Sequence, residues 1–213
     1  GDVYKRQEQE AMKTLQNIYA KEIEKYGKEN VVVLLPYRKK GICSNALNNR
    51  LQRIANSERS GYRHYCKADD NTLFFMKHDL VMQLSNRDEC ANGDVGEVLD
   101  VSPRGVLVNF NDKEVLYSLD DLDQLCLAYA MTVHKSQGSE YKSVIVCMMN
   151  CHIAMLTRNL LYTGITRAKK ECTVVYQQKA FTTAIATIAE ASRITMLKEK
   201  LRTCYMQYKA VCG

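Results

Sequence analysis

Residues 127–146 read LAYAMTVHKSQGSEYKSVIV, and the rest of the sequence is interpreted outward from them. Two apolar runs without a helical period, residues 125–131 and 142–149, enclose a polar segment. Continuous apolar runs of this length are typical of strands that are buried on both faces of a parallel sheet in an α/β protein. The polar segment, residues 132–140, is then a loop at a strand end, where open α/β sheets usually bind ligands.

A second polar stretch follows the second run: residues 158–169 read RNLLYTGITRAK. Together the two strings resemble motifs V and VI of superfamily 1 helicases. The likeness is closest to the RecD/TraA branch, whose members carry T-x-H-K-S-Q-G-S-E and L-Y-T-x-I-T-R-A-K in this order. The chain is thus similar to the C-terminal motor lobe of such a helicase, a UvrD-like helicase C-terminal domain. The resemblance implies an α/β fold with a RecA-like parallel sheet, the second lobe of a P-loop NTPase-like motor.

Short strand-like runs precede this region and point to an inserted domain. They cover residues 74–84, 94–101, 105–110 and 113–119, and turn signals such as Asn92-Gly93 and Asn111-Asp112 separate several of them. Short strands at close spacing predict a small antiparallel barrel. RecD-like helicases carry an SH3-like β-barrel at this point, which contacts DNA or is purely structural.

Three parts of the chain are therefore expected. Residues 1–71 form an N-terminal helix and the first part of the RecA-like lobe, residues 72–124 the barrel, and residues 125–213 the remainder of the lobe with C-terminal helices. Within these parts the spacing of apolar residues predicts helices at 6–26, 42–56, 154–166 and from 181 onward, strands at 31–35 and 172–176, and a linker at 57–71.

The resemblance assigns five residues to the nucleotide. Arg167 matches the arginine finger, the one catalytic residue expected. Arg158 matches the start of motif VI, where a contact to the nucleotide or to the motor interface is expected. Glu140 matches a residue that reaches the ribose or the phosphates, and Gly138 lets the backbone approach the ligand. Arg38 lies in a basic loop like that of motif IV, although a solvated basic turn is an equal alternative. An arginine suits phosphoryl transfer because its guanidinium is always charged and offers paired donors to phosphate oxygens.

Four neighbouring residues are expected to contact DNA. Thr132, His134 and Ser136 match positions that touch the phosphates of single-stranded DNA, and Lys135 either adds charge or faces water. Small hydroxyl groups and backbone in a loop hold a strand without reading its sequence.

The rest of the composition bounds the function. The net charge of +6 is compatible with nucleic acid, and no apolar run reaches the roughly 18 residues of a membrane span. The nine cysteines are expected as cytoplasmic thiols rather than disulfides. Cys147, Cys151 and His152 lie close together without an evident fourth ligand, so buried cysteines are favoured over a zinc site.

Two further patterns concern the motor. Asp88-Glu89 resembles a magnesium-binding pair but follows a polar segment, so an exposed loop is expected. The sequence contains no G-x-x-x-x-G-K-[ST] phosphate loop. The resemblance therefore implies the second half of an ATP-dependent DNA helicase with 5′-to-3′ travel. Its expected partners are single-stranded DNA and an N-terminal RecA-like lobe. That lobe is expected to be the main holder of the Mg²⁺ ion that accompanies ATP. A stand-alone lobe that binds nucleic acid without hydrolysis is the alternative.

Overall fold

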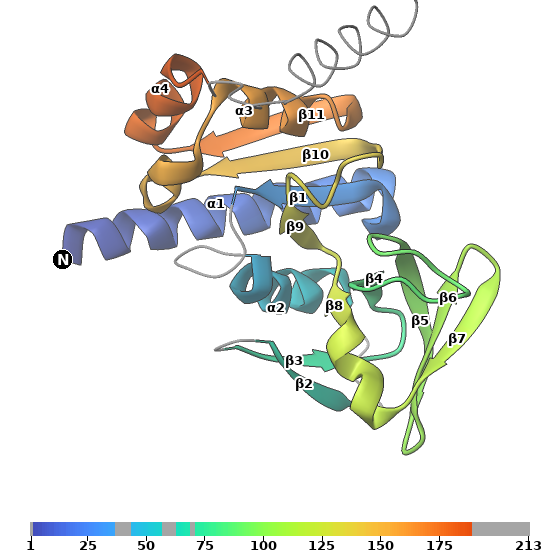
Figure 1. The fold of residues 1–213 in the computed structure, drawn as a ribbon. Coiled ribbons are helices and arrows are strands. Elements are labelled where there is room, and N and C mark those ends of the chain that lie inside the picture. Colours follow the sequence, from blue (N-terminus) through green and yellow to red (C-terminus); the bar gives the residue numbers. More distant parts are fainter. Residues whose placement is uncertain (1, 37–43, 57–62, 69–70, 189–213) are drawn as a thin grey trace, which may run out of the picture.

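A four-stranded parallel sheet forms the part of the molecule that carries both helicase-like strings. The computed structural model describes residues 2–36, 44–56, 63–68 and 71–188. The sheet order is β11-β10-β1-β9, with every neighbouring pair parallel (Figure 1). The strands are Val31–Leu35 (β1), Ala130–Thr132 (β9), Tyr141–Met148 (β10) and Ala168–Tyr176 (β11). The predicted α/β class with a parallel sheet is confirmed.

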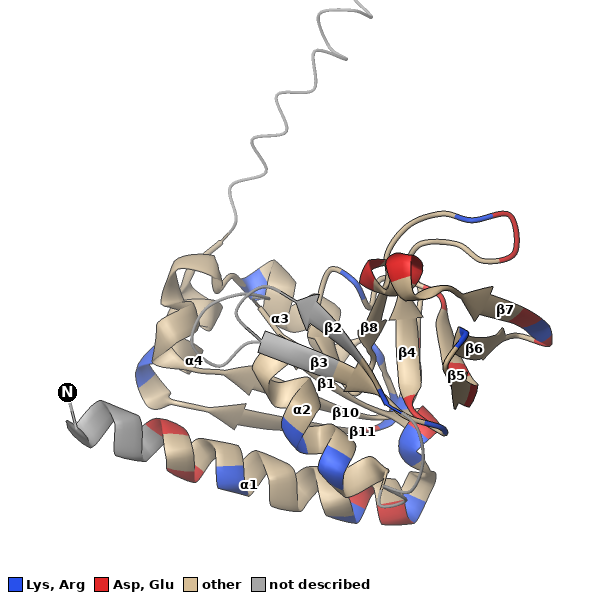
Figure 2. Cartoon of the chain, turned by 90° about the horizontal axis from the view of Figure 1, so that it is seen from below, with Lys and Arg blue, Asp and Glu red and all other residues tan. Residues whose placement is uncertain are grey.

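Helices cover both faces of this sheet. Figure 2 shows α1 (Asp2–Tyr26) on one side, and α3 (Arg158–Ile165) and α4 (Gln178–Ala186) on the other. The helix α1 buries Leu15 and Tyr19, as its apolar spacing predicted. A further helix, α2 (Ser44–Ala55), contacts α1 and β9. Lys and Arg residues are spread over α1, α2, α4 and the strands instead of gathering on one face (Figure 2).

Four strands of the predicted insert join one strand just beyond it in a five-stranded antiparallel sheet, in the order β7-β6-β5-β4-β8. Asn111 and Asp112 both have positive φ, as a tight two-residue hairpin turn requires, which agrees with the turn predicted there. The described strands follow a linear order with β7 and β8 at its ends, so the SH3-like barrel stays a prediction. The strands are Leu80–Gln83 (β4), Val95–Ser102 (β5), Gly105–Phe110 (β6), Lys113–Tyr117 (β7) and Leu125–Leu127 (β8).

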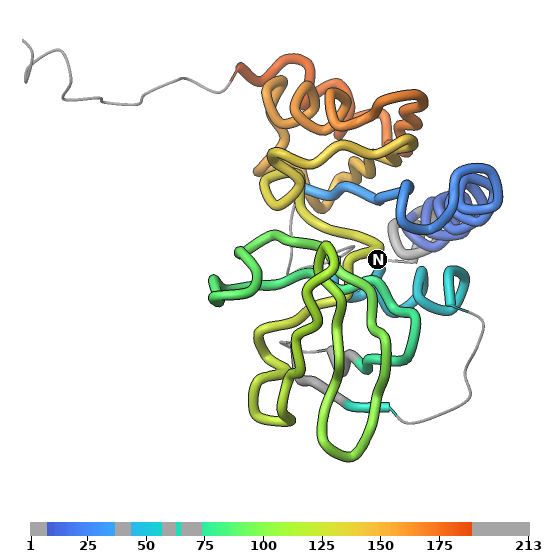
Figure 3. Tube along the Cα trace, turned by 90° about the vertical axis from the view of Figure 1, so that its right-hand side faces the viewer, coloured from blue at the N-terminus to red at the C-terminus, as the bar shows by residue number. Residues whose placement is uncertain are grey.

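The prediction of one strand over residues 125–131 was wrong. Residues 125–127 form β8 against β4, and the chain joins the parallel sheet only at Ala130. Figure 3 shows the two parts of the molecule, with the yellow-green chain around residues 125–132 passing between them. Both halves of the run are buried, so apolar character alone could not reveal that they belong to different sheets.

Two other strand predictions need correction. Residues 74–84 are not one strand, because a turn at Met76–Asp79, with positive φ at His78, separates β3 (Asn71–Phe75) from β4. The expected linker contains a strand, β2 (His64–Ala68), which pairs with β3 in an antiparallel hairpin. Strand β2 reads HYCKA, a mixed sequence without the regular alternation by which a strand could have been predicted.

The helix predicted at residues 154–166 is shorter than expected. Residues Asn150–Met155 form a 3₁₀ turn (η3), and α3 begins after Thr157, whose side chain accepts a hydrogen bond from the backbone N–H of Leu160 at 3.2 Å. Threonine is a common N-cap, so this start was readable from the sequence. Two further 3₁₀ turns occur at Lys28–Asn30 (η1) and Leu119–Gln124 (η2).

Some predictions concern other parts of the chain. Asp88 and Glu89 are exposed in the loop between β4 and β5, as expected. Arg38 and the predicted helical tail beyond residue 188 lie outside the described residues. Within the described ranges, no helix is both long enough and apolar enough to span a membrane.

Candidate functional site

The segment from Thr132 to Glu140 leaves the carboxyl end of β9 and crosses to the start of β10. Its first residues form a tight turn, in which the backbone N–H groups of Lys135 and Ser136 donate to the carbonyl of Thr132 at 2.9 and 3.2 Å. Gly138 has a φ of 88°, a conformation that favours glycine, and no atom lies within 4 Å of the position of an added Cβ. The backbone at Gly138 is therefore open to a ligand.

Arg167 joins the two helicase-like strings. It lies in the turn between α3 and β11, directly after the helix. Its Nη1 donates to the carbonyl of Ser139 at 3.3 Å, and its Nε donates to the carbonyl of Thr163 in the last turn of α3 at 3.3 Å. A cation is favoured at this end of a helix by the exposed carbonyl groups. The side chain is half-buried and keeps further N–H groups for another acceptor.

Glu140 lies beside the same turn. Its carboxylate is 3.0 Å from the Nζ of Lys169, and both side chains are more than half exposed. Two basic residues of the second string, Arg167 and Lys169, thus contact the end of the first loop. An exposed ion pair of this kind contributes little stability and can exchange partners readily.

Arg158 lies at the opposite end of α3 from Arg167. Its Nε donates to the carbonyl of Ile185 at 3.0 Å, and its backbone N–H donates to the carbonyl of Thr187 at 2.9 Å. An eight-residue helix spans about 12 Å, so the structure does not bring Arg158 to Arg167. The observed contacts give it a role in holding the end of α4.

Three of the residues expected to contact DNA lie at the surface of the loop. His134 is exposed, while Thr132 and Lys135 are partly exposed. His134 lines a cleft of about 340 Å³ between the loop and α3. Lys135 extends its Nζ to 2.6 Å from the Oδ1 of Asn92, in the β4–β5 loop.

Ser136 differs from the other three. Its side chain is fully buried, and its hydroxyl donates to the carbonyl of Val133 at 2.7 Å. This bond stabilises the turn and withdraws the hydroxyl from the surface. The DNA-binding prediction therefore depends on Thr132, His134 and Lys135.

Sequence reasoning missed several polar residues of the cleft. The cleft beside His134 is also lined by Gln137 of the loop and by Asn159 and Thr163 of α3. The last two lie four residues apart on the helix. Their spacing places Asn159 and Thr163 on one face of the helix, a signal that the sequence did contain.

Within the described ranges, no group of three or more His, Cys, Asp or Glu side chains is placed to hold a metal ion. Cys147 is buried in β10, and burial raises the pKa of its thiol to about 12.

The comparison with known families agrees with this geometry. Residues 127–175 match the family model of the UvrD-like helicase C-terminal domain, which covers the loop, α3 and β11. This part of the chain belongs to the UvrD-like helicase C-terminal domain family. The predicted resemblance to the second lobe of a superfamily 1 helicase is confirmed.

Related helicases extend the match beyond this UvrD-like domain. The chain is 35% identical over 174 residues to the ATP-dependent RecD2 DNA helicase of Deinococcus radiodurans, covering 81% of this chain. It is 39% identical over 111 residues to the RecBCD enzyme subunit RecD of Haemophilus influenzae, covering 52% of this chain. The chain spans 23% and 16% of the length of these two relatives.

A solved structure supports the fold. The Pif1 helicase of Candida albicans superposes with a TM-score of 0.53 at 16% sequence identity, covering 82% of this chain and 50% of that one. This likeness bears on the fold alone. It extends beyond the UvrD-like domain to most of the chain.

Proposed function

We propose that this chain forms the second motor lobe of an ATP-dependent DNA helicase. In that role Arg167 acts on the nucleotide, and Thr132, His134 and Lys135 form part of a track for single-stranded DNA. The observation that carries the proposal is the hydrogen bond between Arg167 and Ser139, because it brings the two helicase-like strings to one place. The identity of 35% to an ATP-dependent DNA helicase supports the same reading.

The residues present suit the tail of a nucleoside triphosphate. Arg167 offers a permanent positive charge at an open turn, beside the exposed backbone of Gly138 and the carboxylate of Glu140. In phosphoryl transfer the protein mainly stabilises the charge that shifts toward the transferred group. Arg167 would supply that stabilisation when the first lobe brings ATP against it. Mg²⁺, held mainly by the first lobe, would neutralise charge on the phosphates.

The residues proposed to bind DNA lie at the end of β9 and within the next three residues. An exposed histidine, a partly exposed threonine and a lysine can bind phosphates without reading bases. Alternate closing and opening of the two lobes around ATP would then move the bound strand. The 5′-to-3′ direction stays a prediction, and unwinding of duplexes with either a 5′ or a 3′ single-stranded tail tests it.

Arg167→Ala in the intact helicase tests the nucleotide role. We expect the DNA-stimulated ATPase rate to fall by about 10³-fold or more, as for other arginine fingers. Lys170→Ala, an exposed cation on β11, is the matched control and should leave the rate unchanged. A rate for Arg167→Ala within about twofold of wild type would contradict the arginine-finger assignment.

His134→Ala in the 213-residue chain tests the DNA role without the first lobe. Fluorescence anisotropy with a labelled oligothymidine, repeated over a salt series, should show weaker binding at every salt concentration. Thr182→Ala on α4 is the control, since its side chain is exposed and bonds only within its own helix. Equal affinity of His134→Ala and wild type would remove the DNA role from this loop.

A further inference from the structure

Two residues, Ala128 and Tyr129, carry the chain from β8 in the antiparallel sheet to β9 in the parallel sheet (Figure 1). Both sheets hold the backbone of this link. The N–H of Ala128 donates to the carbonyl of Leu80 at 2.9 Å, and the N–H of Val33 donates to the carbonyl of Tyr129 at 3.0 Å. Because β9 has only three residues, the position of the link determines where the loop after Thr132 begins.

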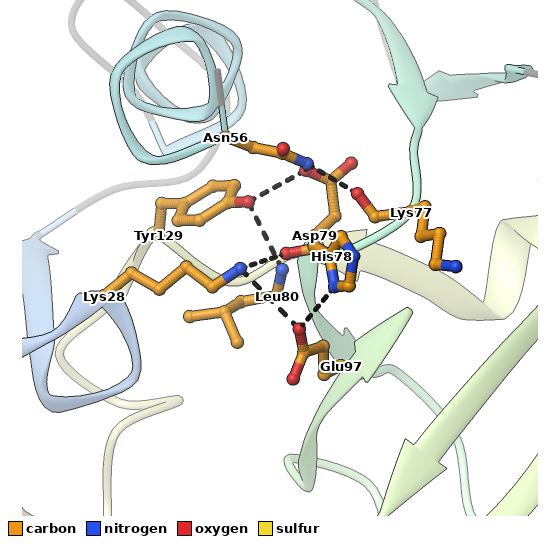
Figure 4. Close-up of polar contacts among 8 residues, drawn as sticks. All are labelled: Lys28, Asn56, Lys77, His78, Asp79, Leu80, Glu97 and Tyr129. Atoms are coloured by element: carbon orange, nitrogen blue, oxygen red, sulfur yellow. Dashed lines mark hydrogen bonds and ion pairs between the residues drawn. The ribbon is translucent and has the colours of Figure 1, made fainter. Parts of the chain in front are cut away.

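The side chain of Tyr129 is also held in place. It is fully buried, and its hydroxyl donates to Oδ1 of Asp79 at 2.8 Å while accepting from the N–H of Leu80 at 3.3 Å (Figure 4). Burial, and then the Asp79 carboxylate, raise the pKa of the Tyr129 phenol above its ordinary value, so the hydroxyl keeps its proton. The link is thereby tied to the turn between β3 and β4.

Asp79 gathers three segments of the chain around one buried carboxylate. Besides Tyr129, it accepts hydrogen bonds from Gln52 at 2.6 Å and Asn56 at 2.9 Å, both at the C-terminal end of α2, and from the backbone N–H of Met76 at 2.8 Å. Each carboxylate oxygen accepts two bonds, and the residue is fully buried. A buried carboxylate is costly without such partners, so the arrangement depends on all of them being in place.

Lys28 and Glu97 contact the turn between β3 and β4 from its more exposed side. The Nζ of Lys28 donates to the carbonyl of His78 at 2.5 Å and lies 3.7 Å from the carboxylate of Glu97 on β5. The Nδ1 of His78 lies 3.1 Å from that carboxylate (Figure 4). Contacts on both sides leave the turn little freedom to shift relative to Tyr129.

We propose that Asp79 is a positioning residue for the DNA-binding loop. Its carboxylate holds Tyr129, and Tyr129 sets the position from which β9 presents Thr132 and His134 to single-stranded DNA. The inference deepens the proposed function and rests on it. It makes the junction between the two sheets a determinant of DNA affinity, although none of its residues touches DNA.

Tyr129→Phe and Tyr117→Phe form a matched pair that tests the proposal. Both tyrosines are fully buried, and the hydroxyl of Tyr117 donates to Gln83 at 2.7 Å inside the antiparallel sheet, away from the link. Each variant loses one buried hydroxyl and keeps its ring. We expect Tyr129→Phe to weaken binding of the oligothymidine by about tenfold, because a misplaced loop loses its phosphate contacts. Tyr117→Phe should stay within about twofold of wild type at a comparable loss of thermal stability.

Hydrogen exchange in the same variants gives a readout that is independent of DNA. Amides of residues 130–136 should exchange faster than in wild type in the Tyr129→Phe and Asp79→Asn variants. In Tyr117→Phe their exchange rates should equal those of wild type. Affinity that follows thermal stability equally in both tyrosine variants, or unchanged exchange in Tyr129→Phe, would overturn the inference. If the exchange changes as expected while wild type and His134→Ala bind DNA equally, the positioning stands and the DNA role of the loop fails.

Discussion

The ammonium group of Lys135 lies 2.6 Å from the Oδ1 of Asn92, which joins the candidate DNA-binding loop to the loop between β4 and β5. The parallel and antiparallel sheets therefore meet at this contact as well as at the Ala128–Tyr129 link. A neutral amide oxygen is a weaker partner for a cation than a phosphate. A bound DNA strand would take Lys135 away from Asn92.

Lys135→Ala should change how DNA binding depends on salt. Losing one phosphate contact lowers the salt slope for a single strand by about 0.7. Arg104→Ala, which removes an exposed cation from the β5–β6 turn, should leave the slope unchanged. Equal slopes for both variants and wild type, measured by anisotropy titrations from low to moderate salt, would show that Lys135 does not contact phosphate.

Asn48→Ala should destabilise the fold strongly. The buried Asn48 side chain donates to the carbonyls of Leu127 and Ala130 at 2.9 and 2.8 Å and accepts from the N–H of Ala130 at 2.7 Å. Removing it leaves buried backbone groups without partners, at about 1–3 kcal/mol each. We expect the free energy of unfolding, measured with urea, to fall by about 3 kcal/mol or more.

Asn45→Ala is the control for this measurement. Asn45 is buried one turn earlier on the same helix, and its Nδ2 has no hydrogen-bond partner. Its removal should cost clearly less than the removal of Asn48, because no bond to Leu127 or Ala130 is lost. Similar losses in the two variants would mean that cavity formation, and not the bonds of Asn48, determines the cost.

The stability of the protein should depend on the ionisation of Asp79. Burial outweighs the surrounding hydrogen bonds and raises the pKa of this carboxyl above its ordinary value. Between its unfolded pKa of about 3.9 and its folded pKa, the folded state binds more protons. The contribution of Asp79 to the free energy of unfolding therefore falls as pH rises through this window.

Urea unfolding of wild type and Asp79→Asn at a series of pH values isolates this contribution. The free energy of unfolding of wild type minus that of the variant should decrease as pH rises from about 4. The variant retains the other charged or ionisable side chains around the turn, Lys28, Lys77, His78, Glu97 and Tyr129, so the difference between the two proteins reports on Asp79. A difference that increases with pH would show that the hydrogen bonds outweigh burial.

Gly105→Ala tests the antiparallel sheet. Gly105 has a φ of 143°, and an added Cβ would lie 1.9 Å from the carbonyl oxygen of Tyr117, so the backbone must shift. We expect a loss of about 3 kcal/mol in the free energy of unfolding. Gly93→Ala, at a φ of 101° with open space around it, should lose only about 1 kcal/mol. Equal losses would mean that backbone strain, not the contact with β7, determines the cost.

Local patterns in the sequence predicted much of the fold. The apolar run of β1 and the spacing of Leu15 and Tyr19 on α1 reflect burial that each segment shows by itself. The turn at Asn111-Asp112 follows from the backbone preferences of those two residues. The strings around His134 and Arg167 were long enough to indicate the helicase family, which the match over residues 127–175 confirms.

The tertiary structure decided what depends on contacts between distant segments. Residues 125–131 are apolar throughout, yet pairing with β4 and with β1 assigns their two ends to different sheets. Asp79 and Tyr129 are 50 residues apart, and the antiparallel pairing of β4 with β8, continued by the bond from Ala128 to Leu80, brings them together. A side chain's partners, and hence whether it faces solvent like His134 or the interior like Ser136, are set by that packing and not by its neighbours in the sequence.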